Sequence, residues 1–158
     1  MKKMLAMLLA LVMVLSLAAC ASTQPAAEPA ASSDAPAESG KTYTVGVCQL
    51  VQHEALDAAT QGFVDALKEA LGDAVTIDVQ NASGDSVNCG TIVNGFVAKG
   101  VDLIMANATP ALTAAVSATA DIPILGTSIT AYGVALDIDD FNGTVGGNVS
   151  GTSDLADL

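Results

Sequence analysis

Residues 101–119 read VDLIMANATPALTAAVSAT, and the order of residue types in this stretch determines the predicted fold. A short apolar run ends abruptly at Asn107, which is typical of a buried strand. Thr109 and Pro110 then begin a run of small residues, with Thr109 expected as the N-cap and Pro110 at the first helical position. The stretch therefore predicts a strand followed directly by a helix, which is part of a βαβ unit.

The same alternation of strand and helix continues on both sides of this stretch. Near-continuous apolar strands indicate a parallel sheet that is buried on both faces. The sequence therefore predicts an α/β fold class, a parallel sheet of about four to five strands with helices on both faces. After residue 127 the alternation weakens, leaving one short helix near residues 131–136 and a segment from 148 that could start another strand. The other predicted strands are YTVGVCQL (43–50), VTIDVQ (75–80) and IPILGT (122–127), and the other predicted helices are 55–71 and 86–100.

The N-terminal segment has the features of an export signal. Two lysines precede an apolar run from Met4 to Leu17, and small residues lead to Cys20. Residues 1–19 therefore predict a secretory signal, and the LAAC ending resembles the lipobox of bacterial lipoproteins, which implies cleavage before Cys20 and lipid on its sulfur. An ordinary signal peptide or a membrane anchor is the alternative. Residues 20–41 lack large apolar side chains and are expected to form a disordered, lipid-anchored tether.

Charge and motifs exclude several classes of function. The net charge is −12 and the chain contains no arginine, so a basic patch for nucleic acid is not expected. The sequence has no HExxH, His cluster or CxxC, which argues against a metal site. It also lacks the GxGxxG, P-loop and GxSxG patterns, so we predict no cofactor and no enzymatic activity.

Cys48 and Cys89 remain once Cys20 is assigned to lipid. An exported protein permits a disulfide between them. The alternative is that both are small buried hydrophobic residues. The sequence does not give the distance between them, so both interpretations stay open.

Polar residues follow four of the predicted strands. In an open parallel sheet, ligands bind beyond the carboxyl ends of the strands, where these four segments are expected to meet. Because there is no arginine, a ligand carboxylate would be held by the helix start at Thr109 and by the hydroxyls of Thr127 and Ser128. The alternative is that these residues only form caps and turns. The candidate ligand-binding residues in the four segments are Gln49, His53, Asp57, Asn81, Asp85, Ala108, Thr109, Thr127, Ser128 and Thr130.

Four strings together resemble a known family. They are VGVCQLVQHEALDAATQGF (45–63), VQNASGDSVNCGTIV (79–93), VDLIMANATPALTAA (101–115) and GGNVSGTSDL (146–155). They look like the ABC-transporter substrate-binding lipoproteins of the type that includes tryptophan- and tyrosine-binding members. The resemblance implies a type I periplasmic-binding-protein-like fold, in which two α/β lobes close on a small ligand. Residues 42–147 then form the first lobe, and residues 148–158 resemble a crossover toward a second lobe, so the sequence is expected to represent roughly half of a binding protein.

The resemblance also implies a function. We expect an extracytoplasmic, lipid-anchored component of an ABC importer that binds a small solute. The resemblance implies that this solute is an amino acid, and an aromatic one as in the tryptophan- and tyrosine-binding members. Its partners would be that solute, an ABC permease with its ATPase, and the membrane through lipid on Cys20. A ligand-sensing lipoprotein on the same fold is the alternative, and a secreted α/β enzyme is a weaker one. Candidates to bind the ligand ammonium are Asp57, Asp85 and Asp154, with Asp154 preferred because a crossover residue can face the cleft, and Tyr132 is the candidate ring partner.

Overall fold

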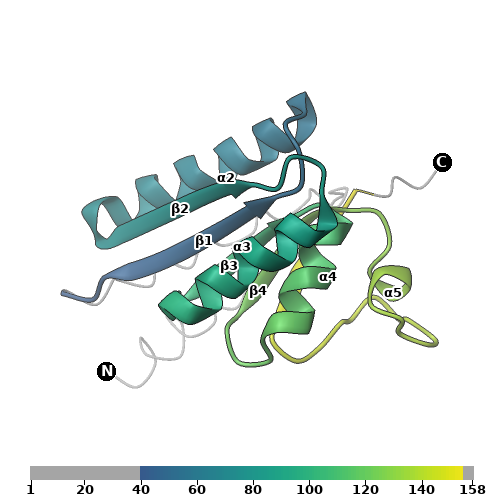
Figure 1. The fold of residues 1–158 in the computed structure, drawn as a ribbon. Helices are drawn as coiled ribbons and strands as arrows, with labels where there is room; N and C mark the ends of the chain where they lie inside the picture. The colour runs from purple at the N-terminus through teal and green to yellow at the C-terminus, as the bar shows by residue number, and fades with distance from the viewer. Residues whose placement is uncertain (1–39, 155–158) are drawn as a thin grey trace, which may run out of the picture. The chain divides into compact units, whose positions relative to one another are not determined.

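The chain folds into an open, five-stranded sheet in which every pair of neighbouring strands is parallel (Figure 1). The computed structural model describes residues 40–154, and the predictions made for residues 1–39, including the lipid site at Cys20, lie outside the described residues. The strand order is β2-β1-β3-β4-β5, which confirms the predicted α/β class with a parallel sheet. The elements are β1 (Tyr43–Gln49), α2 (Glu54–Leu71), η1 (Gly72–Ala74), β2 (Val75–Asn81), α3 (Ser86–Lys99), β3 (Leu103–Asn107), α4 (Thr109–Ala118), β4 (Ile124–Ile129), α5 (Tyr132–Ala135) and β5 (Val149–Ser153).

Helices pack on both faces of the sheet, as the sequence predicts. On one face, Val47 and Met105 form a cluster with Phe63 and Leu67 of α2. On the other face, the larger cluster joins β1, β3 and β4 to α3, α4 and α5. Figure 1 shows α2 on one side of the strands, with α3 and α4 on the opposite side. Within residues 40–154, no helix is long and apolar enough to cross a membrane.

The sheet continues past the predicted end of the first lobe. Strand β5 pairs in parallel with β4, so the sheet includes residues that we assigned to the crossover segment. The ring of Tyr132 lies against Gly126 of β4 and Gly151 of β5, at positions where a Cβ atom would collide with its hydroxyl group. These two glycines therefore allow α5 to pack tightly on the last two strands.

Gly46 in β1 is needed because α3 packs directly on it. A Cβ atom at this position would lie 2.5 Å from Cγ of Phe96, whose side chain is fully buried. We expect Gly46→Ala to lower the free energy of unfolding by about 1–3 kcal/mol, since the ring cannot move away without disturbing the core. Gly95→Ala is the control, because nothing lies within 4 Å of that position in α3 and alanine favours helices. Urea unfolding followed by circular dichroism tests this, and equal losses in both variants would contradict it.

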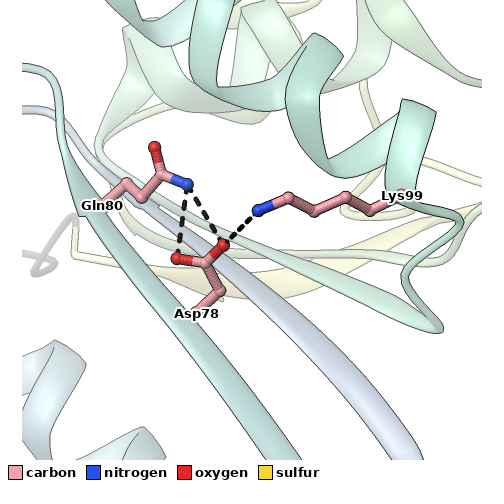
Figure 2. Close-up of polar contacts among 3 residues, drawn as sticks. All are labelled: Asp78, Gln80 and Lys99. Atoms are coloured by element: carbon pink, nitrogen blue, oxygen red, sulfur yellow. Dashed lines mark hydrogen bonds and ion pairs between the residues drawn. The ribbon is translucent and has the colours of Figure 1, made fainter.

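An exposed ion pair joins β2 to the end of α3 (Figure 2). Lys99 Nζ lies 2.7 Å from Asp78 Oδ2, and Gln80 Nε2 donates to both oxygens of the same carboxylate at 3.2 and 3.3 Å. The hydrogen bond from Lys99 holds the pKa of Asp78 below its usual value. The side chains of Asp78 and Lys99 are 34% and 57% exposed, so solvent weakens the attraction between them.

Asp78→Asn is therefore expected to cost less than about 1 kcal/mol at neutral pH. Because folding lowers the pKa of Asp78, its contribution is present above the pKa of the unfolded carboxyl group and is lost as the pH falls through the folded value. Urea unfolding of both proteins measures this at pH 7, above ordinary carboxyl pKa values, and at about pH 3, below them. A difference that grew on acidification would contradict the sign of the effect.

Candidate ligand-binding site

A row of polar residues crosses the carboxyl edge of the sheet. Asn81, Gln49 and Asn107 end strands β2, β1 and β3, and they are paired in register across the sheet. Thr127 of β4 pairs with Asn107 and continues the row. Side chains at paired positions of parallel strands point to the same face, so the row lies on the face that α2 covers. We call these four residues the polar row.

Gln49 is the centre of a hydrogen-bond network between the sheet and α2. Its side-chain amide donates to Asp57 Oδ1 at 2.5 Å and to the Val51 carbonyl at 2.9 Å. Its carbonyl oxygen accepts a hydrogen bond from the Thr60 hydroxyl at 2.6 Å. Gln49 is only 4% exposed, whereas Asp57 lies at the surface. A buried, fully bonded amide thus fixes one oxygen of an exposed carboxylate.

Asn107 extends this network to β3. It is fully buried, and its Nδ2 donates to the Leu56 carbonyl at 2.8 Å and to the Thr60 hydroxyl oxygen at 2.9 Å. Its Oδ1 is also buried and has no hydrogen-bond partner among the described residues. The network therefore ties the first two turns of α2 to the ends of both β1 and β3.

Thr60 and Asn107 were not among the site residues predicted from the sequence. Two signals point to them in retrospect. Asn107 is the last residue of its strand, as Gln49 and Asn81 are of theirs. Thr60 interrupts the apolar stripe that Leu56 and Phe63 form along α2, and a polar residue in such a stripe needs a buried partner. Both signals depend on how α2 lies over the sheet, which the chain's local pattern does not give.

Three of the predicted site residues have local structural roles. His53 is the N-cap of α2, and its Nδ1 accepts from the Ala55 amide at 3.3 Å. Asp85 is the N-cap of α3, and Asn81 Oδ1 accepts from the Ser83 amide at 2.8 Å. All three side chains are exposed. These contacts agree with the cap-and-turn alternative, and ligand contacts by these residues stay predictions.

The predicted N-cap of α4 was wrong by one residue. The cap is Ala108, whose carbonyl accepts from the amides of Ala111 and Leu112 at 3.0 and 3.1 Å. Ala108 has φ 88° and ψ 155°, a conformation that is costly for any residue with a Cβ atom. A tertiary contact helps to hold it there, because its amide donates to the Thr127 carbonyl at 3.0 Å. This contact, which a local cap pattern cannot reveal, is the physical reason for the error.

The shift of the cap leaves one amide available at the start of α4. Thr109 is the first helical residue, and its N–H group has no partner among the described contacts. Pro110 follows and has no N–H group to donate. An anion at this helix start would therefore meet one free donor and the partial positive charge of the helix, which is less than the sequence suggested.

Strand β4 is irregular where the candidate hydroxyls lie. Its register with β5 shifts between Gly126 and Ile129, and Ser128 between them has a positive φ of 56°. A bulge of this kind changes the direction of a side chain and is frequent beside binding sites. Thr127 Oγ1 accepts from Thr152 Oγ1 at 3.5 Å. The Thr130 carbonyl accepts from the Ser153 hydroxyl at 3.1 Å.

The last two predicted residues lie near the ends of β4 and β5. Tyr132 is 6% exposed, and burial raises the pKa of its phenol. Its ring is mainly a core side chain, although it contributes to an apolar hollow of about 330 Å³ with Val134, Ile138 and Phe141. Asp154 is exposed, and its amide donates to the Ile129 carbonyl at 3.1 Å.

The structure groups some of the candidate residues and separates others. Gln49, Asp57 and Asn81 border one polar hollow of about 270 Å³ between α2 and the ends of β1 and β2. Thr109 borders a different hollow between α3 and α4, and Thr127 borders one between α2 and strands β4 and β5. The polar hollow is open and smaller than most ligand pockets, as expected for one wall of a site. No group of three or more His, Cys, Asp or Glu side chains in residues 40–154 is placed to hold a metal ion.

An open parallel sheet with polar residues at its carboxyl edge has the architecture of a lobe that binds small molecules. Residues 44–158 match the family model described as ABC transporter substrate binding protein, and the chain belongs to this family. Over 127 residues it is 40% identical to the tyrosine-binding protein of Clostridioides difficile strain R20291, covering 77% of this chain and 36% of that protein.

Solved structures agree with this assignment. The chain resembles the ligand-free, open structure of a substrate-binding protein with adhesive properties from Clostridium difficile, with a TM-score of 0.68 and 41% identity over 74% of this chain and 40% of that one. It also resembles a Streptococcus pneumonia ABC domain in complex with L-Trp, with a TM-score of 0.65 and 37% identity over 72% of this chain and 39% of that one. The chain thus spans about two fifths of the length of these relatives.

Proposed function

We propose that this chain supplies the first lobe of a substrate-binding protein of an ABC importer, and that it binds an amino acid at the carboxyl edge of its sheet. The observation that carries the proposal is the polar row together with the Gln49–Asp57 contact. This arrangement presents a positioned carboxylate at the edge where open α/β sheets bind ligands.

Asp57 is the best acceptor for the ligand ammonium. Gln49 fixes its Oδ1, while its Oδ2 has no partner among the described contacts. Asp85 uses its Oδ1 to cap α3, which makes it less suitable. Asp154, the residue preferred from sequence, has no side-chain contact that would fix its carboxylate in the described part of the chain. A carboxylate bonded to a positioned amide loses less side-chain entropy when a ligand binds.

The ligand carboxylate would bind at the start of α4. The Thr109 amide is the free donor there, and Ser128 lies near the end of the neighbouring strand β4. Strands β1, β3 and β4 are adjacent, and neighbouring strands lie about 4.8 Å apart. The start of α4 follows β3, the strand next to β1, so the proposed ligand would reach across the ends of these two strands.

Capture would use two walls and no covalent chemistry. This lobe provides one wall, and the further length present in the relatives would provide the other. Closure of two such domains around a ligand excludes water and completes its contacts. The protein would then deliver the amino acid to a permease driven by an ATPase.

Export and anchoring complete the proposal. Residues 1–19 would direct secretion, and lipid on Cys20 would hold the domain outside the cytoplasm by the tether of residues 20–41. An aromatic amino acid is the preferred ligand, because the similar proteins include a tyrosine-binding protein and a complex with L-Trp.

The proposal is tested by ligand-observed NMR on residues 20–158 with Cys20→Ser, because one wall of a cleft should bind weakly. L-tyrosine and L-tryptophan are compared with their N-acetyl and carboxamide derivatives, each of which lacks one of the two charges. We expect binding of the amino acids and at least about tenfold weaker binding of each derivative, since a lost charged hydrogen bond costs about 1.5–3 kcal/mol. Equal binding of amino acids and derivatives, or no binding by any of them, would refute the proposal.

A further inference from the structure

The two cysteines of the described chain lie against each other in the core. Cys48 belongs to β1 and Cys89 to the first turns of α3, and both side chains are fully buried in the same apolar cluster. Their thiols are free in this structure, and the two side chains are near enough to interact with each other. The sequence left a disulfide and two unlinked core residues as alternatives, and the contact between the side chains now distinguishes this pair from unrelated core thiols.

The packing of α3 on β1 explains the contact. Gly46 and Cys48 point to the same face of β1, since side chains alternate along a strand. Phe96 packs on Gly46, and Cys89 precedes Phe96 by two helical turns. Because α3 runs antiparallel to the strands it connects, moving back along α3 from Phe96 follows β1 forward from Gly46. Cys89 is thereby brought over Cys48 by the same close approach that requires glycine at position 46.

We propose that Cys48 and Cys89 form an intramolecular disulfide that fastens α3 to the central part of the sheet. The oxidant is an external disulfide, either a small molecule such as oxidised glutathione or the disulfide of a protein oxidoreductase. The thiolate of one cysteine attacks this disulfide and releases one external thiol, and the second cysteine then attacks the mixed disulfide and releases the other. In total the two protein thiols lose two electrons and two protons, and one external disulfide becomes two thiols.

Burial determines when this reaction takes place. It raises the pKa of Cys48 to about 12 and also raises the pKa of Cys89. Few thiolates therefore exist in the folded chain near neutral pH, and the thiolate is the form that reacts. The disulfide accordingly forms while the chain folds and both thiols are still accessible. Once enclosed, it is shielded from reducing thiols.

The test uses the full chain with Cys20→Ser, so that only Cys48 and Cys89 carry thiols. The chain is reduced in urea and refolded in glutathione buffers. It is then treated with an alkylating reagent under denaturing conditions, and its mass is measured by mass spectrometry. We expect no alkylated cysteine, and a mass lower by two hydrogen atoms than that of the fully reduced, unalkylated chain. We also expect a proteolytic fragment in which a disulfide joins the two residues. Cys89→Ser, which leaves Cys48 without a partner, is the control and should retain one alkylatable thiol.

A second measurement asks whether the fold favours the bond. The ratio of reduced to oxidised glutathione at which half of the chains are linked is compared with and without urea. We expect this ratio to be at least about tenfold more reducing for the folded chain, since the fold holds the two thiols together. Two alkylated thiols after refolding, glutathione on both cysteines, or equal ratios with and without urea would each overturn the proposal.

Discussion

Asp57→Asn is expected to weaken amino-acid binding by about 30-fold or more, because loss of one partner of a hydrogen-bonded charge pair costs about 2–5 kcal/mol. The substitution keeps the shape of the side chain, and the new amide oxygen can still accept from Gln49 Nε2, as Asp57 Oδ1 does now. What it removes is the negative charge that we propose binds the ligand ammonium. The measurement is the dissociation constant of L-tyrosine from NMR titration. This prediction depends on the proposed function, and it also identifies which carboxylate is used.

Asp65→Asn provides a closely matched control for this experiment. Asp65 lies on the same helix, is exposed, and accepts from a glutamine amide, Gln61 Nε2, at 2.7 Å. It stands two turns further along α2, away from the polar row. Its substitution should change the dissociation constant less than about twofold, since exposed charges away from a contact contribute little. Equal effects of the two substitutions would show that Asp57 acts only through the overall charge of the chain.

Asn107→Ala is expected to lower the free energy of unfolding by about 2–4 kcal/mol. The change removes two buried hydrogen bonds from Nδ2, to the Leu56 carbonyl and the Thr60 hydroxyl, at a cost of about 1–3 kcal/mol for the two together. It also leaves a cavity next to Thr60. Loss of the unpartnered Oδ1 offsets part of this cost. Urea unfolding followed by circular dichroism measures the difference.

Asn148→Ala is the matched control for the buried asparagine. Asn148 Nδ2 also makes two hydrogen bonds, to the carbonyls of Thr119 and Ile122 at 3.2 and 2.7 Å. Its side chain is only half-buried, so water can replace the lost donor and the expected cost is about 1 kcal/mol or less. If the two substitutions lowered the free energy of unfolding equally, burial of Asn107 would not be what makes its hydrogen bonds costly to lose.

The elements of this fold could be predicted because their signals are local. Apolar runs with small residues after them define β3 and α4, and the same alternation locates β1, α2, β2 and α3 within a few residues. The parallel order follows from such alternation, since consecutive parallel strands need a crossover helix. The site was predicted less completely because side-chain contacts join segments far apart in the chain. Leu56 and Asn107 are separated by 51 positions, and only the path of α2 over β3 brings them together.

The residues at the strand ends show the same contrast between local signals, which the sequence contains, and contacts between distant segments, which it does not. Gln49 and Asp57 were predicted as neighbours of the ligand, and the structure joins them directly. Thr109 and Thr127 were predicted to act together, yet their side chains border different hollows, and the contact between their segments is the bond from the Ala108 amide to the Thr127 carbonyl. That bond helps to hold Ala108 in its costly conformation, which no cap pattern in the sequence indicates.

The most direct test of the central claim is a map of amide chemical shifts in isotope-labelled residues 20–158, with Cys20→Ser, during titration with L-tyrosine. The account predicts changes at the carboxyl edge of the sheet, in the Gln49 side chain and in the amides of Thr109 and Ser128. The Asp102 amide, which donates to the Thr44 carbonyl at the opposite edge, should not change. Shifts confined to that opposite edge, or to the outer surfaces of α3 and α4, would contradict the claim that this edge binds the ligand.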